Sequence, residues 1–160
     1  MPHIANPRFV LIGNESLLIQ CAERLRERGH VVAAIVTSRP AVRRWAAVQG
    51  VRVLRDAAAL REARDVQPFD HLISVTNLSV LGPDILGLPP RGVINFHDGP
   101  LPEYAGLNTP MWALLDGATS HGITWHRMTN EVDRGDILVE RRFAIDPDET
   151  SLTINTRNYE

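Results

Sequence analysis

Four short apolar segments, separated by amphipathic stretches, constrain the fold of this chain more than any other feature. Each is bounded by residues typical of turns, and one of them, Arg8-Phe9-Val10-Leu11-Ile12-Gly13, ends at a glycine. Such runs are typical of strands that are buried on both faces of a sheet. The predicted strands cover residues 8–13, 31–36, 51–54 and 71–75.

The stretches between these strands show the spacing of helices with one apolar face. In the first, Leu17, Leu18, Cys21, Ala22 and Leu25 recur at helical spacing. The residue before it, Asn14, is a good N-cap, so we expect its side chain to cap that helix. The predicted helices cover residues 15–28, 40–49 and 56–66. Strands separated by helices of this length form right-handed crossovers and a parallel sheet, which predicts the α/β class.

The second half of the chain changes character. Residues 92–97 form a predicted strand that ends in polar side chains, and a loop rich in Gly and Pro follows it. Further along, the pattern predicts a helix over 109–115, strands over 121–128 and 137–145, and a helix beginning at Thr150. We expect a single domain over residues 1–160, built on a mostly parallel twisted sheet with helices on both faces.

Charge and residue usage exclude several functional classes. The net charge is −2, no basic block occurs, and all 17 basic residues are Arg. Binding to nucleic acid through phosphate neutralisation is therefore disfavoured, and a catalytic or P-loop lysine is excluded. The single cysteine, Cys21, lies within a helical apolar pattern, which predicts a buried and unreactive thiol. We see no spacing typical of metal ligands.

The sequence also favours a protein of the cytoplasm with no membrane partner. No run approaches about 18 uninterrupted apolar residues. The first six residues lack the charged and then apolar pattern of a secretory signal.

Polar side chains arrive at the carboxyl end of one predicted strand, where ligands bind in open α/β sheets. Alternation places Asn95 and His97 on one face and Phe96 on the other. An imidazole can accept a proton from an attacking amine, and an amide N–H can stabilise an oxyanion. The pair indicates acyl-group chemistry, whereas two polar residues hydrogen-bonded in a loop are the alternative interpretation.

Asp133 is a third candidate, in the segment Val132-Asp133-Arg134-Gly135-Asp136-Ile137 before a predicted strand. An acidic residue at such a place is commonly part of a turn. If the segment folds back beside Asn95 and His97, the carboxylate would orient the imidazole or relay a proton. The sequence leaves both interpretations open.

Three motifs together resemble the folate-dependent formyltransferases, a family of 10-formyltetrahydrofolate-dependent N-formyltransferases. They are Asn95-Phe96-His97, then Leu101-Pro102-Glu103-Tyr104-Ala105-Gly106, then Val132-Asp133-Arg134-Gly135-Asp136-Ile137-Leu138. The form of these segments is most similar to the formyltransferase domains at the N-terminus of nonribosomal peptide synthetases. The resemblance implies a Rossmann-like formyltransferase fold that is truncated here at its C-terminal helix.

The resemblance implies a role for each residue of the candidate site. Asn95 would hold the oxyanion of the tetrahedral intermediate, His97 would act in proton transfer, and Asp133 would raise the basicity of His97 or relay a proton through water. The formyl donor would be 10-formyltetrahydrofolate, and no metal is implied. Residues that match the two walls of the family's pterin pocket are Leu78, Ser79, Val80 and Leu81 on one side and Met128, Thr129 and Asn130 on the other. Core packing is the alternative for Leu78, Val80 and Leu81.

The acceptor implied by the resemblance is an amine, either an aminoacyl group on a phosphopantetheine carrier protein or a small amine of a natural-product pathway. Glu15, in the first loop, would repel a nucleotide phosphate, and the absence of a basic patch disfavours tRNA. Two alternatives stay open, a formyltetrahydrofolate hydrolase and a catalytically silent docking domain. A nucleotide-binding domain is disfavoured because no G-x-G-x-x-G follows the first strand.

Overall fold

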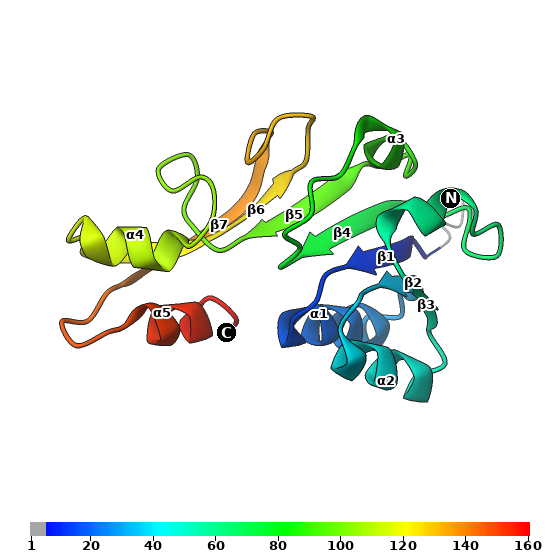
Figure 1. Cartoon of the computed structure of the whole chain (residues 1–160), viewed down its shortest axis with the longest axis horizontal. Helices are drawn as coiled ribbons and strands as arrows, with labels where there is room; N and C mark the ends of the chain where they lie inside the picture. The colour runs from blue at the N-terminus through cyan, green and yellow to red at the C-terminus, as the bar shows by residue number, and fades with distance from the viewer. Residues whose placement is uncertain (1–5) are drawn as a thin grey trace. The chain divides into compact units, whose positions relative to one another are not determined.

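The computed structural model describes residues 6–160, so most of the N-terminal segment considered for a targeting signal lies outside the described residues. The chain forms two compact units, one up to Ile94 and one from Asn95 to Glu160. Its strands follow the order β3-β2-β1-β4-β5-β6-β7, and β5 (Val93–His97) begins in the first unit and ends in the second (Figure 1). The α/β class with a mostly parallel sheet is confirmed.

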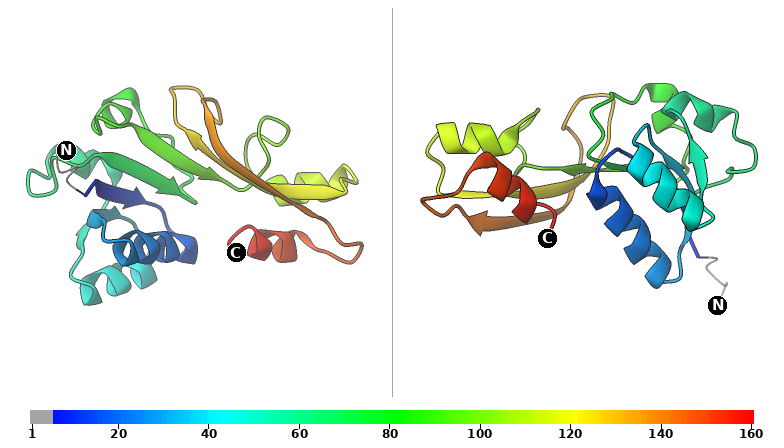
Figure 2. Two further views of the ribbon diagram at one scale, coloured as in Figure 1. Left: turned by 180° about the vertical axis from the view of Figure 1, so that it is seen from behind. Right: turned by 60° about the horizontal axis from the view of Figure 1, so that its bottom comes forward.

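The first unit is built on four strands, and the pairs β1–β2, β1–β4 and β2–β3 are parallel. These strands are β1 (Arg8–Ile12), β2 (Val31–Val36), β3 (Arg52–Leu54) and β4 (His71–Val75). The crossover helices are α1 (Ser16–Glu27) and α2 (Pro40–Val48), which lie side by side in both views (Figures 1 and 2). Each of these elements was predicted, because apolar runs and helical spacing depend only on local sequence.

One predicted helix is wrong in type and length. Residues 56–66 form only the 3-10 helix η1 (Ala57–Arg61), and Asp56 accepts a hydrogen bond from the Ala59 amide at 3.0 Å. Of the buried residues Leu60, Ala63 and Val66, only Leu60 lies within η1. A further short helix, α3 (Pro83–Leu86), was not predicted.

Asn14 does not cap α1. The N-cap position belongs to Glu15, and no side chain bonds there. The side-chain oxygen of Asn14 accepts hydrogen bonds from the hydroxyls of Thr37 and Ser38 and from the Ser38 amide, at 3.0–3.1 Å. Parallel pairing of β1 with β2 brings the loops after both strands to the same edge, and this tertiary contact takes the place of the local cap.

The second unit contains a long antiparallel hairpin and two short helices. Its remaining elements are α4 (Thr109–Leu115), β6 (Ser120–Arg127), β7 (Ile137–Ala144) and α5 (Ser151–Arg157). A bulge between Trp125 and His126 interrupts the β6–β7 register. The helix expected to begin at Thr150 is present, and Thr150 and Thr153 form a reciprocal capping box.

Aromatic contacts contribute to the core of the second unit. Phe96 packs edge-on against Trp125 and Tyr159, with ring centroids 5.2 and 6.2 Å apart.

Within residues 6–160, no helix has the length and apolar character needed to cross a membrane.

A substitution at Gly122 tests how closely strands β6 and β7 pack against each other. A Cβ at this position would overlap the Arg141 carbonyl across the β6–β7 pair. We expect Gly122→Ala to lower the free energy of unfolding by about 3 kcal/mol or more, because backbone on the facing strand must move. Urea denaturation measures the effect. Gly117→Ala is the control, since Gly117 has a φ of +65° with no neighbouring atom within 4 Å and should cost only about 1–2 kcal/mol. Equal losses for the two variants would contradict the packing argument.

The reactivity of Cys21 tests whether burial protects its thiol. Burial raises the pKa of its thiol to about 11. At pH 8 about one thiol in a thousand is then ionised, against about one in ten for a thiol with the ordinary value of 9.0. We expect alkylation by iodoacetamide at pH 8 to be about 100-fold slower in the folded protein than in urea. Similar rates in the two states would show that Cys21 is not protected.

Candidate active site

The candidate site lies within the second unit. The imidazole of His97, at the end of β5, faces the carboxylate of Asp133 there. His97 Nδ1 is 3.5 Å from Asp133 Oδ1, and both side chains are buried, at 6% and 9% exposure. His97 Nε2 donates to the Tyr104 carbonyl at 2.6 Å, since a carbonyl oxygen can only accept. When the ring is protonated, both of its N–H groups therefore face an acceptor.

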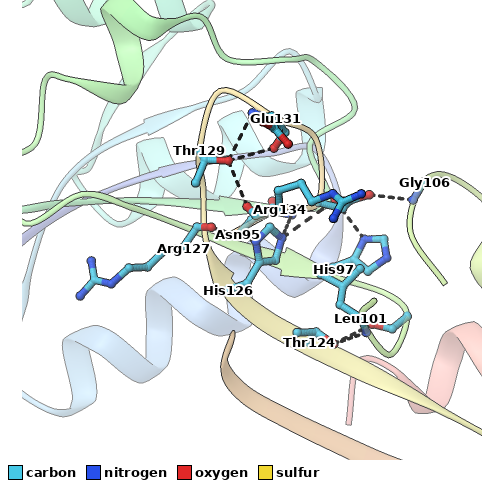
Figure 3. A network of polar contacts seen from close by, with 12 residues as sticks. Asn95, His97, Leu101, Gly106, Thr124, His126, Arg127, Thr129, Glu131 and Arg134 are labelled. Atoms are coloured by element: carbon cyan, nitrogen blue, oxygen red, sulfur yellow. Dashed lines mark hydrogen bonds and ion pairs between the residues drawn. The ribbon is translucent and has the colours of Figure 1, made fainter. Parts of the chain in front are cut away.

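Asp133 also forms a hydrogen bond with the loop that follows β5. Its Oδ2 accepts a hydrogen bond from the Gly106 amide at 2.7 Å, while Oδ1 faces His97. Figure 3 shows Gly106 and His97, the two residues that contact Asp133, on two different segments. One carboxylate thus connects the Gly- and Pro-rich loop to the imidazole.

The hairpin connection explains how Asp133 reaches the site. Residues 128–136 join β6 to β7, and antiparallel pairing folds this connection back over the end of β6. Asp133 has a φ of +51°, a left-handed conformation that Asp adopts more readily than most residues. Gly135 has a φ of +122°, and a Cβ there would overlap the Arg127 carbonyl. The tight turn expected of this segment is therefore present, and it also delivers the carboxylate.

Asn95 reaches the site through a fourth residue, His126. The Asn95 amide nitrogen lies 3.2 Å from His126 Nε2, and that same ring nitrogen lies 3.9 Å from Asp133 Oδ1. Figure 3 shows Asn95, His97 and His126 close to one another. The structure therefore brings together all three predicted catalytic residues. Their catalytic roles stay predictions.

The loop between β5 and α4 is anchored on both sides of the candidate site. The Asp98 carbonyl accepts from Thr109, His121 and Asn158, at 2.5, 2.8 and 3.1 Å. Thr124 accepts from the Leu101 amide at 3.0 Å and donates to the Gly99 carbonyl at 2.8 Å, as Figure 3 shows in part. These bonds hold the residue next to His97 in a single backbone position.

Burial sets the electrostatic character of the two histidines on β6. The pKa of His126 is lowered chiefly by burial, against the opposing effects of the Arg127 carbonyl and the Asp133 carboxylate. The pKa of His121 is also lowered chiefly by burial, against the Asp98 carbonyl. Both rings are therefore favoured in the neutral form near pH 7, where one ring nitrogen can accept a hydrogen bond.

The predicted pterin-pocket residues of the first unit divide into two groups. Leu81 is buried at 4% exposure and belongs to the core, whereas Leu78 and Val80 are 81% and 79% exposed. Both backbone groups of Ser79 bond to the side chain of Asn77, at 3.2 and 2.8 Å. Core packing, the alternative considered for three of these residues, thus applies to Leu81 and is wrong for Leu78 and Val80.

The other predicted pocket residues lie at the start of the loop that carries Asp133. Met128 is half-buried, and Thr129 and Asn130 are exposed. The Thr129 hydroxyl accepts from the Glu131 amide at 3.2 Å and lies 3.3 Å from the Arg134 carbonyl (Figure 3). The hydroxyl of Thr129 therefore shapes the turn, while binding of a ligand by these residues stays a prediction.

Sequence reasoning did not assign His126, the Tyr104 carbonyl or the Gly106 amide to the site. A polar residue within the predicted β6 strand was the available signal for His126. The two backbone groups have no sequence signature, because any residue supplies them. No cluster of metal-binding side chains occurs among residues 6–160.

Taken together, the site offers amide hydrogens and an imidazole–carboxylate pair next to a neutral histidine. Amide N–H groups stabilise negative charge on an oxygen, and an imidazole moves protons near neutral pH. The arrangement suits attack by a neutral nucleophile on a carbonyl-like carbon.

Comparisons with known proteins agree with this chemistry. A family model described as formyl transferase matches residues 21–160. The methionyl-tRNA formyltransferase of Anaeromyxobacter dehalogenans strain 2CP-C is 30% identical over 167 residues, covering 94% of this chain and 53% of that protein. The chain thus spans about half the length of the curated relatives it matches.

Solved structures share the fold at low identity. The glycinamide ribonucleotide transformylase 1 of Symbiobacterium toebii has a TM-score of 0.86 and 22% identity, covering 96% of this chain and 81% of that one. A formyltetrahydrofolate deformylase from Pseudomonas syringae pv. tomato also has a TM-score of 0.86, with 19% identity, covering 98% of this chain and 57% of that one. Because the family model spans most of the sequence, the chain belongs to the formyl transferase family.

Proposed function

We propose that this chain catalyses transfer of a formyl group from 10-formyltetrahydrofolate, the family's formyl donor, to an amine. The observation that carries the proposal is the convergence of Asn95, His97 and Asp133, linked through His126. Membership of the formyl transferase family supports the same reaction.

The proposed step forms a C–N bond to the acceptor and breaks the bond between the formyl carbon and N10 of the folate. The amine lone pair attacks the formyl carbon, and a hydrogen of the Asn95 amide stabilises the oxygen as it becomes negative. His97 moves the proton that the amine loses, and N10 receives a proton as it leaves. Asp133 holds the His97 ring in position through the 3.5 Å contact with Nδ1.

Two exposed apolar side chains support folate binding on the first unit. Leu78 and Val80 lie on the loop after β4, with about four-fifths of each side chain in contact with solvent. The flat face of a pterin ring packed against them would remove this surface from water, which is favourable in proportion to the apolar area buried. We propose that this loop supplies one wall of a pterin site. For the second unit, pterin binding by Met128, Thr129 and Asn130 is a separate proposal from the resemblance of the motifs.

For the acceptor, we propose an aminoacyl group on a carrier protein or a small amine of a natural-product pathway, in line with the resemblance of the motifs. Glu15 supports an acceptor without a phosphate at this place, because it is exposed at the N-cap of α1 and its charge would repel one. The curated relatives are named for methionyl-tRNA, one structural neighbour for glycinamide ribonucleotide, and another as a formyltetrahydrofolate deformylase. The activity assay therefore needs to compare acceptors of all these classes.

The test uses the chain with 10-formyltetrahydrofolate and a panel of acceptors: aminoacyl carrier proteins, small amines, glycinamide ribonucleotide and methionyl-tRNA. Mass spectrometry should show an acceptor heavier by one formyl group. Free formate without a formylated acceptor would indicate a hydrolase instead. Folate binding without either product would indicate a docking domain.

Two variants test the assigned residues. We expect His97→Ala to lower kcat by about 10²–10⁴-fold and Asn95→Ala by about 10²–10³-fold, with the Kd for folate nearly unchanged. His30→Ala, a histidine in the other unit, is the matched control and should keep its activity. Wild-type rates in His97→Ala would remove the proposed role of this residue.

A further inference from the structure

In the candidate site, the Asn95 amide contacts the ring of His126. His126 follows the bulge in β6 and is 1% exposed. Its Nδ1 lies 3.0 Å from the Arg127 carbonyl, which can only accept, so Nδ1 carries a hydrogen. In the neutral ring, Nε2 is then left with a free lone pair.

This tautomer determines which end of the Asn95 amide faces the ring. Nε2 accepts, so the NH₂ group of Asn95 must face it, in agreement with the 3.2 Å contact. An amide NH₂ has two hydrogens, and the bond to His126 uses one of them. The second hydrogen is then directed away from the ring and is available to a ligand.

From this geometry we propose that His126 is a positioning residue, which holds the Asn95 amide so that its second N–H faces the oxyanion of the formyl-transfer intermediate. The inference rests on the proposed function and adds to it a residue that acts through Asn95. His126 itself does not touch the reacting atoms.

The charge state of His126 decides whether it can play this part. The groups around the ring are the Asn95 amide, the Asp133 carboxylate at 3.9 Å, the His97 ring at 6.5 Å between centroids, and the carbonyls of Arg127 and Arg134. Protonation would place a hydrogen on Nε2, directly against the NH₂ group of Asn95. The amide would then turn over and present its oxygen to the developing negative charge.

The sign of the pH dependence follows from burial. Burial lowers the pKa of His126 below its ordinary value of 6.5, so the ring is neutral at pH 7 and gains its proton only as the pH falls further. Activity that depends on neutral His126 should therefore be complete at neutral pH and lost on the acid side, below pH 6.5.

Two substitutions separate positioning from general stability. His126→Leu removes the acceptor, and we expect kcat to fall about 10- to 100-fold with KM for folate nearly unchanged, less than the loss of an oxyanion donor itself. His126→Gln supplies an uncharged acceptor oxygen near the place of Nε2, and we expect kcat within about fivefold of wild type. Because Gln does not titrate, its kcat should also persist to lower pH than that of the wild type.

His121→Leu is the matched control for loss of a buried histidine from the same strand. His121 is fully buried and bonds to the Asp98 carbonyl, with no bond to Asn95. We expect this variant to lose stability in urea denaturation and to keep the acid side of the wild-type pH profile. If His126→Gln kept that same acid side, or lost as much kcat as His126→Leu, the positioning role would be overturned.

A spectroscopic measurement keeps the inference separate from the proposed function. In ¹⁵N-labelled wild type, NMR should show His126 protonated at Nδ1 alone near pH 7, and a side-chain NH₂ signal of Asn95 that shifts in His126→Leu. A ring protonated at Nε2, or an unchanged Asn95 signal, would overturn the inference even in an active enzyme. Absence of formyl transfer by the wild type, with both signals as expected, would instead reject the proposed function alone.

Discussion

The candidate site depends on the two contacts made by the buried carboxylate of Asp133. A carboxylate removed from water is costly unless hydrogen bonds and opposite charge compensate it. Asp133 meets this requirement with the Gly106 amide on one oxygen and His97 on the other. The loop after β5, the connection between β6 and β7, and the imidazole at the end of β5 therefore stabilise one another's positions.

Two histidines on neighbouring strands perform opposite hydrogen-bonding roles in this site. His97 has acceptors at both ring nitrogens, the Tyr104 carbonyl and the Asp133 carboxylate. His126 has an acceptor at Nδ1 and a donor, the Asn95 amide, at Nε2. The two rings therefore differ in their hydrogen-bond partners, a difference that arises from their neighbours rather than from the residue type.

Much of the fold was predictable because its signals are local. The apolar runs of β1, β2 and β4 and the amphipathic spacing of α1 need no knowledge of distant residues. Prediction was wrong at Asn14, where a tertiary contact decided the outcome, and over residues 56–66. Asn14 bonds to Thr37 and Ser38 instead of capping α1, and the segment predicted as an α-helix contains only the 3-10 helix Ala57–Arg61.

Local sequence patterns suffice to predict the α/β class, and alternation along one strand places Asn95 and His97 on the same face. Asp133, 36 residues beyond His97, reaches the same place only in the folded chain, because the register of the β6–β7 hairpin sets where the connecting loop returns. The tertiary structure also assigned His126 to Asn95. Hydrogen-bond partners depend on distances of a few tenths of an ångström, which residue spacing along a chain does not encode.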